Sequence, residues 1–115
     1  MIPARMAIYI ATGPLDLRRS FDGLAAVTRE VLRHDPFSGA LFLFFNKAQN
    51  RVKILWWDQT GYCLLYKRLE RGAFRVPKAL EPGATSVAID AAEMKSILEG
   101  IALPATRFRS KAQAA

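Results

Sequence analysis

The 115-residue sequence contains one cysteine, Cys63, and one histidine, His34. A single cysteine cannot form a disulfide within the chain, and this pair alone cannot supply the ligands of a metal cluster. No apolar run approaches the roughly 18 to 20 residues that a transmembrane helix needs. Residues 1–14 are too short and too β-branched for a signal peptide. We therefore expect a cytoplasmic protein with no metal, no cofactor and no membrane contact.

Acidic residues are scarce compared with basic ones. The chain has 10 Asp and Glu against 17 Lys and Arg, which gives a formal net charge of +7. The bases concentrate in residues 47–78, whereas residues 79–104 are acidic on balance. A concentrated positive field of this kind favours contact with nucleic acid or another polyanion.

Two helices are predicted from apolar periodicity and capping residues. Apolar side chains recur at helical spacing over residues 17–33, with Asp16 placed to cap the start and Pro36 to end the helix. A second, shorter helix is expected to begin after an N-cap at Asp90 and to end at Gly100.

Short β-type runs bounded by turn residues make up most of the remaining chain. They predict strands at residues 6–11, 40–45, 51–57, 62–70 and 85–90, with a further edge strand at 73–76. The order β-α-β-β-β-(β)-β-α indicates an α+β fold in which a mainly antiparallel sheet packs against one long amphipathic helix. We expect one domain over residues 1–103 and a flexible basic tail over residues 104–115.

The stretch 51–70 predicts a hairpin with two different faces. If residues 58–61 form the turn, Arg51 lies opposite Arg68, and side chains alternate between the faces. One face then carries Arg51, Lys53, Leu55, Trp57, Tyr62, Leu64, Tyr66 and Arg68. The other carries Val52, Ile54, Trp56, Cys63, Leu65 and Lys67, joined by Phe42 and Phe44 of the preceding strand. We expect the long helix to cover this second face.

The first face combines bases with aromatic rings. Two arginines opposite each other repel unless an anion lies between them, and aromatic rings beside bases are typical of sites that hold single-stranded nucleic acid. The candidate DNA-contacting residues are Arg51, Lys53, Lys67, Arg68 and Arg71, followed by Arg18 and Arg19. The alternative is that the apolar parts of this face are buried while the basic heads extend to water. A one-residue bulge would also change the assignment of faces.

The carboxylates do not form a recognisable catalytic set. A metal-dependent nuclease needs several convergent carboxylates, and the candidates are Asp16, Asp22, Asp58 and Glu70. Asp16 and Asp22 would point in different directions from a helix, and Asp58 is placed as a turn residue. We expect no catalytic residue and no enzyme activity.

Several ordered motifs resemble one known family. They are Asp16-x-Arg18, Asp22-Gly23-Leu24, Asp35-Pro36-Phe37-Ser38-Gly39, Trp57-Asp58-x-x-Gly61 and Lys67-Arg68-Leu69-Glu70-x-Gly72-x-Phe74. Over residues 3–77 the chain resembles the Orf2-like, or TnpB, accessory proteins of insertion-sequence-66-type mobile elements. A longer RNA-guided nuclease shares the name TnpB, and this chain does not resemble it.

The resemblance implies a non-catalytic accessory role in DNA transposition, with transposon DNA and the transposase of the same element as partners. Two departures bear on the site: Val76 stands where an aromatic residue usually precedes the proline, and the turn at 46–50 is less basic than expected. The strands are therefore better candidates for DNA contact than the turn. The alternative is a pure protein-interaction module that docks on the transposase through Trp57, Tyr62 and Tyr66.

Overall fold

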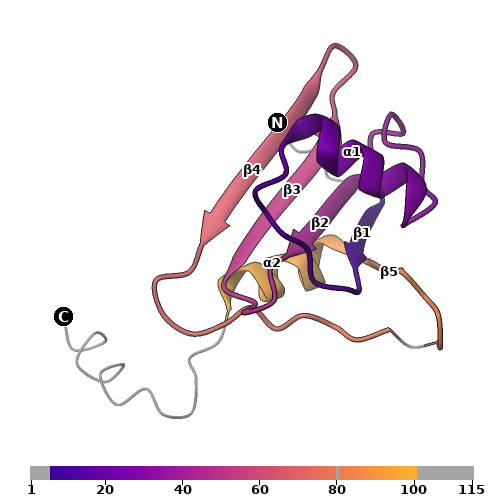
Figure 1. Ribbon diagram of the computed structural model, residues 1–115. Helices are drawn as coiled ribbons and strands as arrows, with labels where there is room; N and C mark the ends of the chain where they lie inside the picture. Colours follow the sequence, from indigo (N-terminus) through magenta and orange to yellow (C-terminus); the bar gives the residue numbers. More distant parts are fainter. Residues whose placement is uncertain (1–5, 80, 101–115) are drawn as a thin grey trace.

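The computed structural model describes residues 6–79 and 81–100 (Figure 1). Its elements are β1 (Ile8–Ala11), α1 (Phe21–Glu30), β2 (Leu41–Phe45), β3 (Arg51–Trp57), β4 (Tyr62–Arg68), β5 (Ser86–Ile89) and α2 (Ala91–Glu99). The predicted α+β class is confirmed, and the predicted strand at 73–76 is reduced to one bridge residue, Ala73. The predicted tail at 104–115 lies outside the described residues. None of the helices described is long and apolar enough to cross a membrane.

The five strands form one mixed sheet in the order β4-β3-β2-β1-β5. Three pairings are antiparallel, in agreement with a mainly antiparallel sheet, and the pair β1–β2 is parallel. Parallel neighbours need a crossover connection, which α1 provides between these two strands. The sheet is therefore mainly antiparallel with one parallel pair at its centre.

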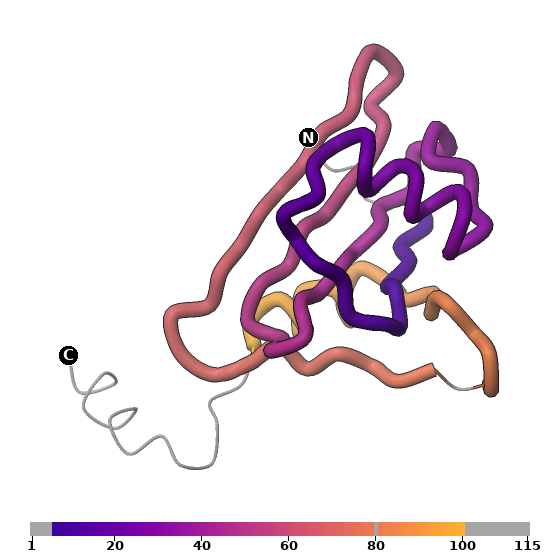
Figure 2. Tube along the Cα trace, in the orientation of Figure 1, coloured from indigo at the N-terminus to yellow at the C-terminus, as the bar shows by residue number. Residues whose placement is uncertain are grey.

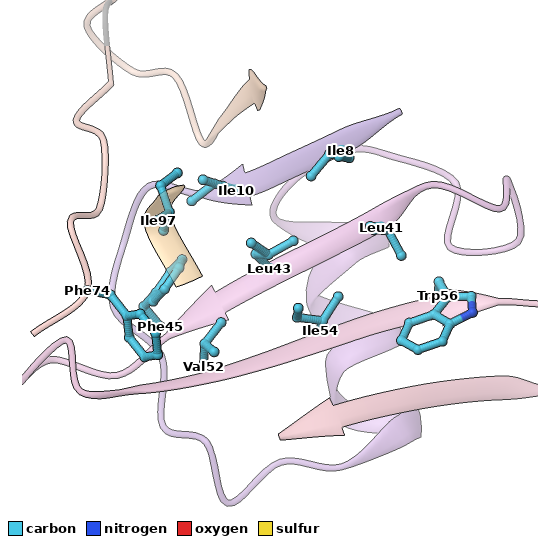
Figure 3. Packing of buried hydrophobic residues seen from close by; sticks show 10 residues of the cluster. All are labelled: Ile8, Ile10, Leu41, Leu43, Phe45, Val52, Ile54, Trp56, Phe74 and Ile97. Carbon is cyan, nitrogen blue, oxygen red and sulfur yellow. The ribbon is translucent and has the colours of Figure 1, made fainter. Parts of the chain in front are cut away.

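Each face of the sheet is covered by one helix. On one face, Ile97 of α2 and Phe74 pack against the strands (Figure 3). This cluster comprises Ile8, Ile10, Leu41, Leu43, Phe45, Val52, Ile54, Trp56, Phe74 and Ile97. On the opposite face, α1 covers a second cluster that comprises Ala11, Leu17, Leu24, Ala25, Leu32, Ala40, Phe42, Phe44 and Leu55. Removal of these apolar surfaces from water is the main stabilising contribution to such a fold.

The prediction of which face the first helix covers is wrong. Helix α1 packs on the face of Leu55, while α2 covers the face of Val52. Phe42 and Phe44 also lie under α1, because Phe42 pairs with Leu55 and directly paired residues share a face. The turn between β2 and β3 determines which residues of the two strands share a face, since it pairs Phe45 with Val52.

Helix α1 has 10 residues and is shorter than the predicted helix at 17–33. Asp16 does not cap it; its carboxylate instead accepts hydrogen bonds from the backbone N–H and the guanidinium group of Arg18. At the other end, the chain has left the helical conformation by Arg33, whose φ of 60° lies in the left-handed region, so Pro36 does not end the helix.

Helix α2 begins as predicted. Asp90 accepts a hydrogen bond from the backbone N–H of Glu93 at 2.7 Å, and the Glu93 carboxylate accepts one from the N–H of Asp90 at 2.9 Å. This reciprocal capping box satisfies two N–H groups that a helix start would otherwise leave unbonded. The helix ends at Gly100, whose φ of 73° favours glycine.

Candidate functional site

The β3–β4 hairpin has the predicted register, with Arg51 opposite Arg68 and Trp57 opposite Tyr62. Arg51 begins β3 and Trp57 ends it, so the two pairs lie about 20 Å apart at the usual rise per strand residue. Figure 2 shows the turn at 58–61 at one end of the sheet and the turn at 46–50 at the other. The structure therefore separates the basic candidates from two of the aromatic ones.

The basic end of the hairpin is open to solvent. Arg51 and Arg68 are both exposed, and Tyr66 is 52% exposed on the same face. Facing arginines in register repel each other, which costs stability when no anion lies between them. This end of the hairpin therefore presents positive charge and an accessible aromatic ring together.

Lys53 lies on the same face of β3 as Arg51, but its side chain is buried. It is 8% exposed, and its Nζ donates a hydrogen bond to the backbone carbonyl of Arg19 at 2.8 Å. The same ammonium lies 4.8 Å from the centroid of the Tyr66 ring, within the range of a cation–π interaction. Lys53 thus ties the hairpin to the segment before α1 and supports the Tyr66 ring. We leave it out of the proposed DNA-contacting surface.

A groove of about 600 Å³ runs beside this end of the hairpin. Its charged and aromatic lining includes Arg18 from the loop before α1, Lys47 from the β2–β3 turn, and Arg51 and Tyr66 from the hairpin. An adjoining hollow continues past Arg68. We call these five residues the basic groove. Sequence reasoning did not select Lys47, although its place in the turn directly before the basic strand was a signal.

Both walls of the basic groove are fixed by hydrogen bonds. The backbone N–H of Leu15 donates to the carbonyl of Phe45 at 2.9 Å, which attaches the loop to the end of β2. Oδ1 of Asn46 accepts from the backbone N–H groups of Asn50 and Arg51 at 3.0 and 2.9 Å, which closes the β2–β3 turn. The backbone that carries Arg18, Lys47 and Arg51 is therefore held in place by hydrogen bonds.

Two of the groove arginines already have acidic partners. Arg18 pairs with Asp16 at 2.6 Å, and Arg68 pairs with Glu70 at 3.1 Å, with all four side chains largely exposed. Exposed ion pairs are weak, because water screens them and the side chains lose freedom. A phosphate group could therefore compete with either carboxylate.

The Asp16–Arg18 pair predicts a lowered pKa for the carboxyl group of Asp16. Hydrogen bonds from Arg18 lower the pKa of Asp16 from 3.8 to about 2. Since the folded-state pKa is lowered, this contribution to stability is present above the unfolded pKa and is lost as the pH falls through about 2. We expect Arg18→Gln to raise the pKa of Asp16 toward 3.8 in a carbon-detected NMR titration. Arg19→Gln, the matched control, should leave that pKa near its wild-type value; equal shifts in the two variants would contradict the assigned pair.

The remaining basic candidates lie outside the basic groove. Lys67 points to the opposite face, where its Nζ donates to the backbone carbonyl of Leu98 at 2.7 Å. Arg71 is exposed in the bend after β4, and Arg19 is exposed just before α1. The structure therefore brings together Arg18, Arg51 and Arg68, but not the other four predicted residues.

The aromatic end of the hairpin carries Trp57 and Tyr62, both half-buried, with ring centroids 5.0 Å apart. Burial raises the pKa of Tyr62. Phe37, from the loop between α1 and β2, completes the cluster and is 54% exposed. Tyr66 lies on the same face of the hairpin but toward its other end, so only Trp57 and Tyr62 of the three predicted partner-binding residues are in direct contact. Phe37 was not selected from the sequence as a site residue, although it stands in one of the motifs that carry the resemblance.

Two of the carboxylates considered as catalytic candidates, Asp16 and Asp58, make local hydrogen bonds. Asp16 binds Arg18, and Oδ1 of Asp58 accepts hydrogen bonds from Thr60 and Gly61 in the β3–β4 turn. These bonds lower the pKa of Asp58. Within residues 6–79 and 81–100, no three His, Cys, Asp or Glu side chains are grouped so that they could hold a metal ion.

Comparison with known proteins identifies the family. The model of the IS66 Orf2-like protein family matches residues 6–108. The uncharacterized protein y4hO of Sinorhizobium fredii (strain NBRC 101917 / NGR234) is 41% identical over 103 residues, which cover 88% of this chain and 87% of that protein. The uncharacterized protein y4jC of the same strain is 40% identical over 76 residues, 65% of each chain. No solved structure gives a significant match. The chain therefore belongs to the family of IS66 Orf2-like proteins.

Proposed function

We propose that this protein is a non-catalytic accessory factor in the transposition of an insertion sequence and that it contacts DNA through the basic groove. Membership of the IS66 Orf2-like family supports the accessory role. The groove supports the DNA contact, because its four basic side chains outnumber the two carboxylates in the lining, Asp16 and Glu70, and lie beside one exposed tyrosine ring.

The in-register pair Arg51 and Arg68 is the observation that carries the proposal. Two exposed arginines in facing strand positions repel each other in the free protein. A DNA phosphate between them would turn this repulsion into two attractive contacts, and guanidinium groups suit phosphate oxygens well. The Glu70 carboxylate bonded to Arg68 offsets part of this repulsion in the free protein, and a bound phosphate would offset the rest.

Tyr66 gives the groove a second kind of contact. Its ring lies next to the bases, is half exposed and is held in place by Lys53. A base that is not stacked in a duplex could stack on this ring, a contact that tolerates any sequence. The proposed ligand is therefore DNA with some single-stranded character, held mainly by its phosphates.

Salt dependence tests this proposal. For single-stranded DNA, each phosphate contact adds about 0.7 to the steepness of the fall of log affinity with log salt. We expect a steep loss of affinity with salt for a labelled single-stranded oligonucleotide, measured by fluorescence anisotropy, and a shallower loss for Arg51→Ala/Arg68→Ala. Weak binding of equal salt dependence in both proteins would contradict the proposal.

The second candidate function is docking on a protein of the same element, such as the transposase, without DNA contact. The exposed Phe37 ring beside Trp57 and Tyr62 favours it. Co-purification with the transposase that is lost in Phe37→Ser would support this function, whereas co-purification that persists in Phe37→Ser would count against it.

A further inference from the structure

A hollow of about 980 Å³ opens at the end of the sheet opposite the basic groove. Two segments far apart in the sequence form most of its lining, residues 34–40 and residues 56–59. Phe37 and Trp57 are in edge-to-face contact in its wall, with centroids 4.9 Å apart and planes at 90°. Tyr9 adds a further ring to the lining. We call this site the aromatic pocket.

The aromatic pocket is bordered by loops that hydrogen bonds hold in place. Oδ1 of Asp35 accepts from the backbone N–H of Phe37 at 2.9 Å, and the hydroxyl of Ser38 accepts from the N–H of Ala40 at 3.2 Å. Gly39 has a φ of 88°, a conformation that favours glycine and lets the loop return to β2. An exposed ring on an ordered loop is a preformed contact point.

The charge of this pocket is opposite to that of the chain. Its described lining contains two exposed carboxylates, Asp35 and Asp58, and no lysine or arginine, although the chain as a whole carries +7. The lining also contains His34, whose ring stacks on Tyr9 with centroids 4.0 Å apart. Turn N–H groups lower the pKa of Asp58, so this carboxylate stays ionised at neutral pH. Carboxylates repel phosphate, so a nucleic-acid backbone is a poor occupant here.

Aromatic rings beside carboxylates suit a cation with a flat face. The guanidinium group of arginine can stack on a ring while it donates two parallel hydrogen bonds to a carboxylate. Lysine can make the first contact and a single hydrogen bond. The aliphatic stem of either side chain can cover the apolar walls.

We propose that the aromatic pocket receives an arginine side chain from a basic, apolar segment of a partner protein. This inference deepens the second candidate function and does not depend on DNA binding in the basic groove. The two sites lie at opposite ends of β3, about 20 Å apart, so a protein segment and DNA could be bound at the same time.

A matched pair of peptides tests the proposal on the full chain. The probes are an acetylated Leu-Arg-Leu-Arg-Leu amide and its twin in which citrulline, of the same shape but without charge, replaces arginine. In ¹⁵N-edited NMR titrations we expect the arginine peptide to shift the signals of Phe37, Gly39 and the Trp57 indole. We expect it to bind about tenfold more tightly than the citrulline twin.

Two variants locate the effect. Asp35→Asn/Asp58→Asn can keep the Oδ1 acceptors that hold both turns, while it removes the negative charge and replaces the second carboxylate oxygen of each residue with an NH2 group. It should therefore abolish the preference for arginine over citrulline. Phe37→Ser removes an exposed ring and should weaken both peptides. Unchanged signals in the rest of the spectrum show that each variant is folded.

Four results would overturn the proposal. They are equal binding of the two peptides to the wild-type protein, shifts that map away from the pocket, the same shifts with thymidine monophosphate, and the same shifts when the protein alone is concentrated. The third would make the pocket a nucleotide site, and the fourth would make a second copy of the chain its occupant. Because none of these measurements involves the basic groove, failure here leaves the salt-dependence test of DNA binding intact.

Discussion

Arg51→Glu is expected to weaken DNA binding by about tenfold or more and at the same time to stabilise the fold slightly. The substitution replaces a phosphate contact with a repulsive charge in the basic groove. It also turns the repulsive pair with Arg68 into an attractive cross-strand pair, worth roughly 0.2–1 kcal/mol. Anisotropy titrations and urea unfolding curves of the same preparation measure both effects. If Arg51 had only a structural role, the substitution would not lower the DNA affinity while raising the free energy of unfolding.

Arg29→Glu is the matched control for the charge. Arg29 is exposed in the last turn of α1, near Tyr62 and away from the basic groove, and the substitution changes the net charge by the same amount. It should leave most of the DNA affinity in place. If both variants lose the same affinity, then the overall charge of the protein binds DNA and the groove has no special part.

Phe42→Ala should lower the free energy of unfolding by about 3–5 kcal/mol. Phe42 is fully buried between β2 and α1 and stacks on Tyr9 with ring centroids 5.8 Å apart. Removal of the ring leaves a cavity that neighbours fixed in a sheet cannot fill. Domains of this size have about 5–15 kcal/mol of stability, so urea unfolding should show a much lower midpoint.

Phe37→Ala provides the comparison for this prediction. Its ring is 54% exposed and makes two surface aromatic contacts, with Trp57 and Tyr62, so the loss of stability should stay at about 1–2 kcal/mol. A loss below about 1 kcal/mol for Phe42→Ala, or a loss for Phe37→Ala as large as the one expected for Phe42→Ala, would contradict the assignment of core and surface.

The hairpin could be predicted from the sequence because its information is local. Alternation of apolar residues and the turn signal at 58–61 were enough to set Arg51 opposite Arg68. The capping box of α2 was predictable for the same reason, since its two partners are three residues apart.

The faces of the sheet could not be predicted in the same way. They depend on the pairing of β2 with β3, where a turn of different length would place Phe42 on the opposite face. The parallel pairing of β1 with β2 is equally non-local, because it depends on how α1 packs. The start of α1 was predicted wrongly because Asp16 binds Arg18 instead of a helix N–H group.

The candidate site was predictable in part. Arg51, Arg68 and Tyr66 follow from strand alternation alone, and the structure brings them together with Arg18. The burial of Lys53 was not predictable, because it requires the carbonyl of Arg19 to lie above the sheet.

Chemical-shift mapping with a short single-stranded oligonucleotide tests most directly whether the basic groove is the DNA-contacting surface. If the basic groove is that surface, the largest shifts fall on its residues, Arg18, Lys47, Arg51, Tyr66 and Arg68, and decrease with salt. The signals of Phe37 and the Trp57 indole should stay in place, since the aromatic pocket repels phosphate. Shifts centred on the aromatic pocket, or spread evenly over all exposed bases, would contradict this assignment.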